Sequence, residues 1–127
     1  MTKKNNILRR TRFDRAQDES TSDFLSSMDQ DYKILEADIW VDKVHVLMLD
    51  KQNIISTEHA IPILKALESI ASIDSSKLGT RGFEDVHVFL ETELIKRLGD
   101  STGGRLHTAK SRNDEVATCI RISLRDD

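Results

Sequence analysis

The sequence predicts an all-α protein, a small domain of about four helices preceded by an extended N-terminal arm. Apolar residues recur at helical spacing in four segments, at 33–51, 57–73, 84–98 and 114–127. Runs of alternating apolar and polar residues, which would indicate strands, are nearly absent. The 127 residues suffice for one small domain with a modest core. The single cysteine, Cys119, excludes an internal disulfide.

The first 19 residues are polar and aperiodic, and we expect them to form a basic arm ahead of a helical domain at 20–127. Residues 1–15 hold six basic side chains against one aspartate, a balance of +5 in a chain whose net charge is −3. A basic arm can bind nucleic acid, but only Phe13 is interleaved with these charges and no nucleic-acid motif follows. We therefore expect the arm to pack on the acidic body, with no nucleic-acid partner.

The first two long helices show apolar stripes that predict their buried faces. A short turn at 23–28, capped by Thr21 or Ser22, should precede them. In the first long helix we expect Trp40 and Met48 in the core; the full stripe is Ala37, Trp40, Val41, Val44, Leu47 and Met48. The second helix has its stripe at Ile61, Leu64, Leu67 and Ala71. Pro62 lies too deep for a first-turn proline, which predicts a later start or an irregular first turn.

The third helix has apolar residues four apart, and its end is marked by Gly99. Its stripe is Val86, Leu90, Leu94 and Leu98. His87 and Glu91 could in principle share a metal ion, but two ligands without a third do not make a site, so we expect none. The last helix should begin at Asn113 or Asp114 as its N-cap and bury Cys119 as a small apolar residue.

The run 103–115 carries most of the chain's chemistry. Two glycines lead into a stretch rich in charged and hydrogen-bonding side chains, which ends at the start of the last helix. Lys110, Ser111, Arg112 and Asn113 would then converge near free backbone N–H groups, an arrangement suited to a carboxylate or phosphate. An ordinary polar loop with a well-capped helix is the alternative.

The residues of this run resemble the first signature region of the argininosuccinate lyase family, in the fumarase/aspartase superfamily. The matching motif is Ser-Arg-Asn-Asp at 111–114, preceded by His-Thr at 107–108. Ala109-Lys110 replaces the Gly-Arg that is common in the family, so one backbone-permissive glycine is lost. Further resemblance lies at 11–13, 24–39, 52–56 and 84–87, so it runs from about Thr11 to the last residue and covers the N-terminal part of the family's protein.

The resemblance implies the fold of the lyase N-terminal domain, with 114–127 beginning a central helical bundle, and a set of substrate-binding residues. It implies a substrate contact for Ser27, with Asp31 beside it, and places His87 near the active site. A carboxylate can hold a guanidinium and a hydroxyl can both donate and accept. The implied substrate-binding set is Ser27, Asp31, His87, Thr108, Ser111, Arg112 and Asn113. No cofactor or metal is implied, and no catalytic residue, because two other signature regions supply the acid-base groups.

The implied function is the N-terminal domain or fragment of argininosuccinate lyase, which splits argininosuccinate into arginine and fumarate by β-elimination in arginine biosynthesis. We expect the chain alone to be inactive. A naturally short, non-catalytic homologue acting as an interaction or regulatory module is the alternative. The family forms homotetramers, and we expect a dimer or larger assembly through an apolar stripe at Val116, Cys119, Ile120 and Leu124. No signal peptide or membrane-spanning run is apparent, which predicts a cytoplasmic protein without a membrane partner.

Overall fold

The computed structural model describes residues 18–73 and 82–126, and this part of the chain is all-α with no strand. The predicted fold class is therefore confirmed. The elements in order are α1 (Glu19–Leu25), α2 (Met28–Asp31), the 3₁₀-helix η2 (Tyr32–Ile34), α3 (Leu35–Lys51), α4 (Thr57–Ala71), α5 (Val86–Leu98), α6 (Asp100–Gly103), the 3₁₀-helix η4 (Gly104–His107) and α7 (Arg112–Asp126). The four predicted helices correspond to α3, α4, α5 and α7, with ends within two residues of the prediction. None of the described helices is both long and apolar enough to cross a membrane.

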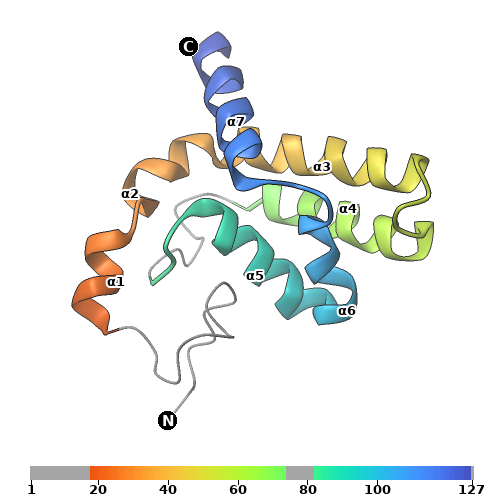
Figure 1. Ribbon diagram of the computed structural model, residues 1–127, viewed down its shortest axis with the longest axis horizontal. Coiled ribbons are helices and arrows are strands. Elements are labelled where there is room, and N and C mark those ends of the chain that lie inside the picture. The colour runs from red at the N-terminus through yellow and green to blue at the C-terminus, as the bar shows by residue number, and fades with distance from the viewer. Residues whose placement is uncertain (1–17, 74–81, 127) are drawn as a thin grey trace.

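The arrangement is a helical hairpin with a third helix across it. Helices α3 and α4 run side by side in opposite directions, α5 packs against both, and α7 crosses α3 and then projects away from the body (Figure 1). The core between them is closed mainly by aliphatic side chains and Phe89. Phe83 meets Phe89 edge-on, with ring centroids 5.3 Å apart. The polar loop at 108–111 therefore leads from α5 and α6 back onto α3.

Helix α1 begins at Glu19, earlier than the predicted turn at 23–28. Most of the expected arm, residues 1–17, lies outside the described residues, as does the connector at 74–81. Asp18 is the N-cap of α1 and accepts a hydrogen bond from the Thr21 N–H at 3.1 Å. Hydrogen bonds from Ser20 and Thr21 lower the pKa of Asp18 to about 2. The predicted cap at Thr21 or Ser22 is wrong, because the aspartate three residues before Thr21 makes the capping bond.

The predicted buried face of α3 is also wrong, apart from Ala37, which is buried. Trp40, Val44, Leu47 and Met48 are exposed, whereas the core side is formed by Leu35, Ile39, Val46 and Leu49. Both sets have helical spacing, so α3 is apolar on two sides. The true core side also contains two buried aspartates, Asp38 and Asp42. A periodicity argument rejects a side that carries two carboxylates, and this is why it selected the opposite one.

The buried side of helix α4 also differs from the predicted one, but by less. Leu67 is buried as predicted, but Ile61 and Ala71 are exposed, and the core side is completed by Ala60, Ile63 and Ile70. The helix starts at Thr57, as its predicted range has it, so of the two alternatives raised by Pro62 the later start is excluded. Pro62 has no N–H, which removes one backbone hydrogen bond in the second turn.

Helix α5 follows the sequence prediction closely, and a close backbone contact fixes what comes after it. Val86, Leu90 and Leu94 are fully buried. Gly99 ends the helix with φ of +79°, and α6 then folds back onto α5. A Cβ on Gly103 would lie 2.7 Å from the backbone of Ile95. This glycine is therefore required for the close packing of α6 on α5.

We predict that Gly103→Ala destabilises the fold by about 1–3 kcal/mol, because the added methyl group collides with backbone atoms that cannot move independently. The adjacent Gly104→Ala is the matched control, since a Cβ there meets nothing within 4 Å and φ is −66°. Thermal and urea unfolding of both variants measure the difference. Equal stabilities would mean that α6 does not pack closely on α5.

Candidate functional site

Only residues 108–111 of the polar run form the predicted loop into α7, because Gly104–His107 is the 3₁₀-helix η4 and α7 begins at Arg112, earlier than expected. Helix α7 starts at Arg112, so Asn113 and Asp114 lie in its first turn and are not the cap. The hydroxyl of Ser111, just before the helix, accepts a hydrogen bond from the Asn113 N–H at 3.3 Å. Ser111 and Asn113 are exposed and Arg112 is half-buried. These neighbouring side chains are therefore presented where the loop meets the helix N-terminus.

The loop contains a left-handed turn at a residue that is not glycine. Ala109 has φ of +55°, in the left-handed region where glycine is usually found. A non-glycine residue there costs roughly 1–2 kcal/mol, so the surrounding contacts must hold the conformation. The carbonyl of Thr108, next to it, is hydrogen-bonded to His45 Nε2 of α3 at 2.8 Å. This bond is one of the contacts that hold the strained turn in place.

The next residue, Lys110, turns inward. Its ammonium group lies between the carboxylates of Asp42 on α3 and Glu115 on α7, and its side chain is 4% exposed. Lys110 therefore does not join Arg112 at the surface, and the expectation that both cations would converge on one ligand is wrong. The lysine instead joins the loop to two helices from beneath.

Lys110 is part of a larger buried ionic cluster, which consists of Asp38, Asp42, His87, Lys110 and Glu115. His87 Nδ1 lies 2.9 Å from Asp38 Oδ2 and 3.8 Å from Glu115 Oε2. All five side chains are almost completely buried. His87 therefore lies beneath the surface and contacts two carboxylates; its predicted contact with substrate stays a prediction.

Burial and ion pairing shift the pKa values of the cluster in opposite directions. Burial would lower the pKa of His87, but the hydrogen bond and charge of Asp38, with the charge of Glu115, outweigh it and raise the pKa. Burial likewise opposes the charge of Lys110, whose pKa is nevertheless raised by Asp42 and Glu115. Burial raises the pKa of Asp38 and Asp42, and their partners only partly compensate. The cations of the cluster are thus stabilised in their charged forms.

Three members of the cluster could in principle hold a metal ion. One ligand atom each from Asp38, His87 and Glu115 lie within 4.8 Å of one another, and Glu115 Oε2 has no hydrogen-bond partner. The raised pKa of His87, however, favours the protonated ring, which cannot ligate a metal through Nδ1. Lys110 already contacts Glu115 Oε1. The geometry is better explained as a network of internal ion pairs than as a metal centre.

A second, more exposed layer contains Ser27 and Asp31. The Ser27 hydroxyl donates to Asp31 Oδ2 at 2.6 Å, and the Ser27 N–H donates to the Glu84 carbonyl at 2.8 Å. Ser26 Oγ donates to the Phe83 carbonyl at 2.8 Å. These bonds fix the segment before α3 against the segment that precedes α5, although 57 residues separate them in the sequence.

Asp85 connects this layer to the signature loop. One of its oxygens caps α5 by accepting the Val88 N–H at 2.8 Å, and the other pairs with Arg112 Nη1. The structure thereby links three of the predicted segments, at 27–31, 84–87 and 111–113. Sequence reasoning did not select Asp85, although an aspartate directly before an apolar helical pattern is a recognisable N-cap signal. Thr108 is half-buried on the same loop.

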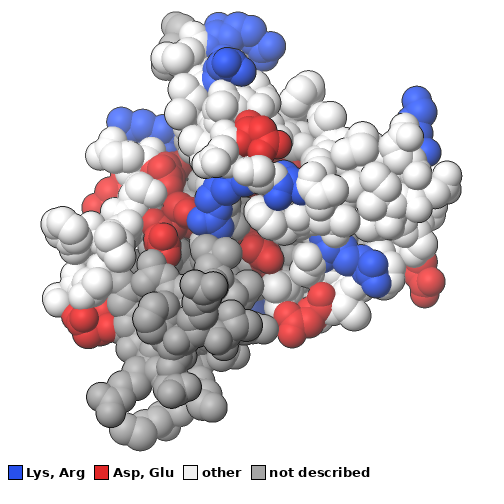
Figure 2. Space-filling model, viewed as in Figure 1, with Lys and Arg blue, Asp and Glu red and all other residues white. Residues whose placement is uncertain are grey.

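The exposed layer is suited to a ligand with both anionic and cationic groups. Ser111, Asn113 and the first N–H groups of α7 are donors, and a helix N-terminus favours a carboxylate. Asp31 is a carboxylate acceptor next to a hydroxyl. Among the described residues, acidic and basic side chains are intermixed on the face shown in Figure 2.

We predict that His87 makes the stability of the fold depend on pH. A pKa raised above the ordinary value of 6.5 means that His87 contributes stability fully below pH 6.5 and loses it as the pH rises through the folded-state pKa. The melting temperature should therefore fall as the pH is raised above 6.5. In His87→Gln this fall of the melting temperature with rising pH should disappear. At low pH the variant should be less stable than the native chain. Identical slopes for both proteins, measured by calorimetry, would contradict the ionic role of His87.

Comparison with protein-family models gives no match. Curated proteins do match. The argininosuccinate lyase of Methanosarcina barkeri is 48% identical over 122 residues, which is 96% of this chain and 25% of that protein. The argininosuccinate lyase of Natronomonas pharaonis is 54% identical over 104 residues, 82% of this chain and 21% of that protein. That of Methanocaldococcus jannaschii is 43% identical over 122 residues, again 25% of its length.

The chain therefore spans about a quarter of the length of the curated relatives that it matches. The matched stretch covers nearly all of this chain, including the loop and both layers of the site. Together with the all-α fold, this confirms the resemblance found in the sequence: the chain is homologous to argininosuccinate lyases, as their N-terminal portion.

Proposed function

We propose that this chain provides the first substrate-binding region of an argininosuccinate lyase, which cleaves argininosuccinate into arginine and fumarate in the cytoplasm during arginine biosynthesis. The observation that supports this most directly is the Asp85–Arg112 ion pair, together with the Ser27–Glu84 hydrogen bond. These contacts bring together residues that the family resemblance assigns to substrate, from segments far apart in the sequence. The identity of 41–54% to proteins of that name supports the same substrate.

The chemistry of the exposed layer suits the two kinds of group in argininosuccinate. Its carboxylates would accept hydrogen bonds from Ser111, Asn113 and the N-terminus of α7. Its guanidino group would lie near Asp31, which is positioned by Ser27. Asp85 would hold the Arg112 side chain in one orientation. The buried ionic cluster would contribute indirectly, by fixing the loop that carries these donors.

The chain alone is expected to be inactive. β-Elimination needs a base that removes a C–H proton and an acid that protonates the departing nitrogen. The family resemblance assigns these groups to two further signature regions, a His-x-Gln motif and a Gly-Ser-Ser loop, contributed by other subunits of a homotetramer. This chain would therefore supply binding groups for a catalytic centre that is completed by the rest of the enzyme.

A chimera tests the proposal. Replacing the matched 122 residues of the Methanosarcina barkeri lyase with this chain should give an enzyme that releases fumarate, while the isolated chain releases none. Asn113→Ala in the chimera should lower kcat/KM by about 100-fold or more, as expected for loss of one substrate donor in a desolvated site. Gln52→Ala, an exposed amide at the end of α3, is the matched control and should leave the rate unchanged.

Two results would count against this function. A chimera that assembles but releases no fumarate would favour the alternative, a non-catalytic interaction or regulatory module. Equal effects of Asn113→Ala and Gln52→Ala would remove Asn113 from the substrate-binding set. Ultraviolet detection of fumarate and sedimentation analysis supply both readouts.

Self-association of the isolated chain is a further part of the proposal. Ile120 and Leu124 are exposed and four residues apart on the projecting part of α7. Cys119 is fully buried, as predicted for a small apolar residue, with Sγ 3.5 Å from Asp38 Oδ1, so it is not part of this surface as the predicted stripe had it. We propose a two-fold dimer through Ile120 and Leu124.

Sedimentation of the isolated chain should show a mass that rises with concentration. In Ile120→Glu the mass should return to that of the 14.5 kDa monomer. A native chain that stays monomeric at high micromolar concentration contradicts the proposed dimer.

A further inference from the structure

The loop before α7 contains a turn whose backbone is that of a type II β-turn, at residues 107–110. Thr108 has φ of −59° and ψ of 126°, and Ala109 has φ of +55°. The Lys110 N–H donates to the His107 carbonyl at 3.4 Å, which closes the turn. A type II turn needs a positive φ at its third residue, and glycine adopts this conformation without strain. Ala109 is therefore a residue that this turn type does not favour.

A type I turn is the competing conformation for the same four residues. It differs from type II by a rotation of the central peptide unit, which changes ψ of the second residue and φ of the third. Ala109 would then have a negative φ, which is relaxed for alanine. The Thr108 carbonyl and the Ala109 N–H would exchange directions, because they point to opposite sides of one planar peptide. A contact from outside the turn must therefore favour type II.

His45 of α3 supplies such a contact. Its Nε2 lies 2.8 Å from the Thr108 carbonyl oxygen, and this nitrogen must carry a hydrogen because a carbonyl only accepts. In a type I turn that oxygen would point away from His45, and the hydrogen bond would be lost. The bond is thus specific to the type II orientation. It also directs the Ala109 N–H away from α3, since the two groups of the peptide point in opposite directions.

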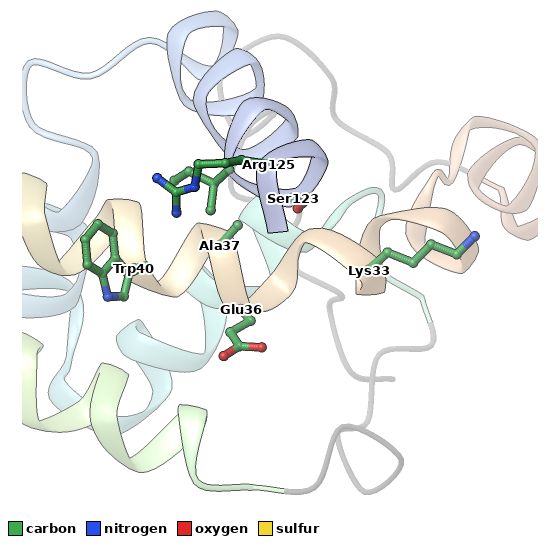
Figure 3. A pocket seen from close by; sticks show the side chains of 7 residues that line it. Lys33, Glu36, Ala37, Trp40, Ser123 and Arg125 are labelled. Carbon is green, nitrogen blue, oxygen red and sulfur yellow. The ribbon is translucent and has the colours of Figure 1, made fainter. Parts of the chain in front are cut away.

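The segment that follows the central peptide is fixed to α3 by other contacts. Lys110 pairs with Asp42 of α3. Farther along, α7 lies against the same helix: Figure 3 shows Ala37 of α3 next to Ser123 and Arg125 of α7, at the groove between the two helices. Loss of the histidine contact should consequently change the orientation of the central peptide without displacing the whole loop.

We propose that His45 is a positioning residue for the substrate-binding loop, which holds the 108–109 peptide so that the Ala109 N–H, and not the Thr108 carbonyl, faces away from α3. This rests on the proposed function, in which the loop binds a carboxylate. Ala109 is exposed, so its N–H is a further donor close in the chain to Ser111. A carbonyl oxygen turned to the same place would repel a carboxylate. His45 thereby strengthens substrate binding without contacting substrate.

Kinetics of the chimera with the Methanosarcina barkeri lyase test this role. His45→Leu should raise KM about tenfold and leave kcat within about threefold, because substrate binds only the fraction of loops that are in the type II form. His45→Gln keeps an N–H donor and should stay within about threefold of the native KM. His59→Leu is the matched control, because His59 is also half-buried but bonds to Thr102 Oγ1, at 3.0 Å, outside the loop. It should leave KM unchanged.

A second substitution, Ala109→Gly, tests whether His45 acts through the turn. Glycine adopts a positive φ without strain, so the type II turn no longer depends on the histidine. Adding His45→Leu to Ala109→Gly should therefore change KM by less than about threefold, a non-additive result for two residues that act on one peptide. A contribution of His45 to the fold alone would not be rescued in this way.

NMR of the isolated chain reports the peptide orientation directly. The native chain should show a strong nuclear Overhauser effect between the Thr108 Hα and the Ala109 amide proton, which lie close together when ψ of Thr108 is 126°. In His45→Leu this effect should weaken, and one between the Thr108 and Ala109 amide protons should appear. Adding Ala109→Gly should restore the native pattern.

The contrary outcomes are distinct. An unchanged KM or an unchanged NMR pattern in His45→Leu overturns the inference, as does an equal rise of KM in His59→Leu or a failure of Ala109→Gly to rescue. A His45→Leu chain that does not fold would make His45 a structural residue, which also overturns it. If the native chimera releases no fumarate but His45→Leu changes the NMR pattern as expected, the proposed function is wrong and the hold of His45 on the peptide is supported.

Discussion

The ammonium group of Lys110, held between Asp42 and Glu115, is the contact on which the candidate site depends. It joins the loop at 108–111 to α3 on one side and to the first turn of α7 on the other. Asp42 lies on the core side of α3, where two aspartates replace apolar packing. Each of these charges would be costly if buried alone, so the loop, α3 and α7 are stable in this arrangement only together.

The site is consequently built in two layers. Beneath, the buried ionic cluster fixes the position of the loop and sustains the left-handed turn at Ala109, which lacks the glycine common in the lyase family. Above, Asp85 joins Arg112 to the start of α5, next to the segment that carries Ser27 and Asp31. Ser27, Ser111 and Asn113 are thus exposed and Asp31 and Arg112 half-buried, while the ionic cluster beneath them is withdrawn from water.

The sequence predicted the helices well and their orientations less well, for a physical reason. In α5 the predicted stripe is buried as expected, at Val86, Leu90 and Leu94, although Val88 and Phe89 outside that stripe are buried too. Helix α3 is apolar on two sides, and its core side contains Asp38 and Asp42. Only the location of their partners, Lys110 on a distant loop and His87 on α5, makes burial of those carboxylates possible. The same limitation applies to the loop, where Lys110 and Arg112 look equivalent in sequence but point into different layers.

A double-mutant cycle on Lys110 and Asp42 tests the central role of the buried pair most directly. Removing the ammonium alone, in Lys110→Met, should destabilise the fold by about 3–5 kcal/mol, because Asp42 is left buried without its cation and Glu115 keeps only His87. Adding Asp42→Leu should recover part of that loss, with a coupling free energy above about 1 kcal/mol in urea unfolding. The exposed pair Lys43–Glu68 is the matched comparison, for which coupling should be about 0–1 kcal/mol. Additive effects of Lys110→Met and Asp42→Leu, within about 0.5 kcal/mol, would contradict the account.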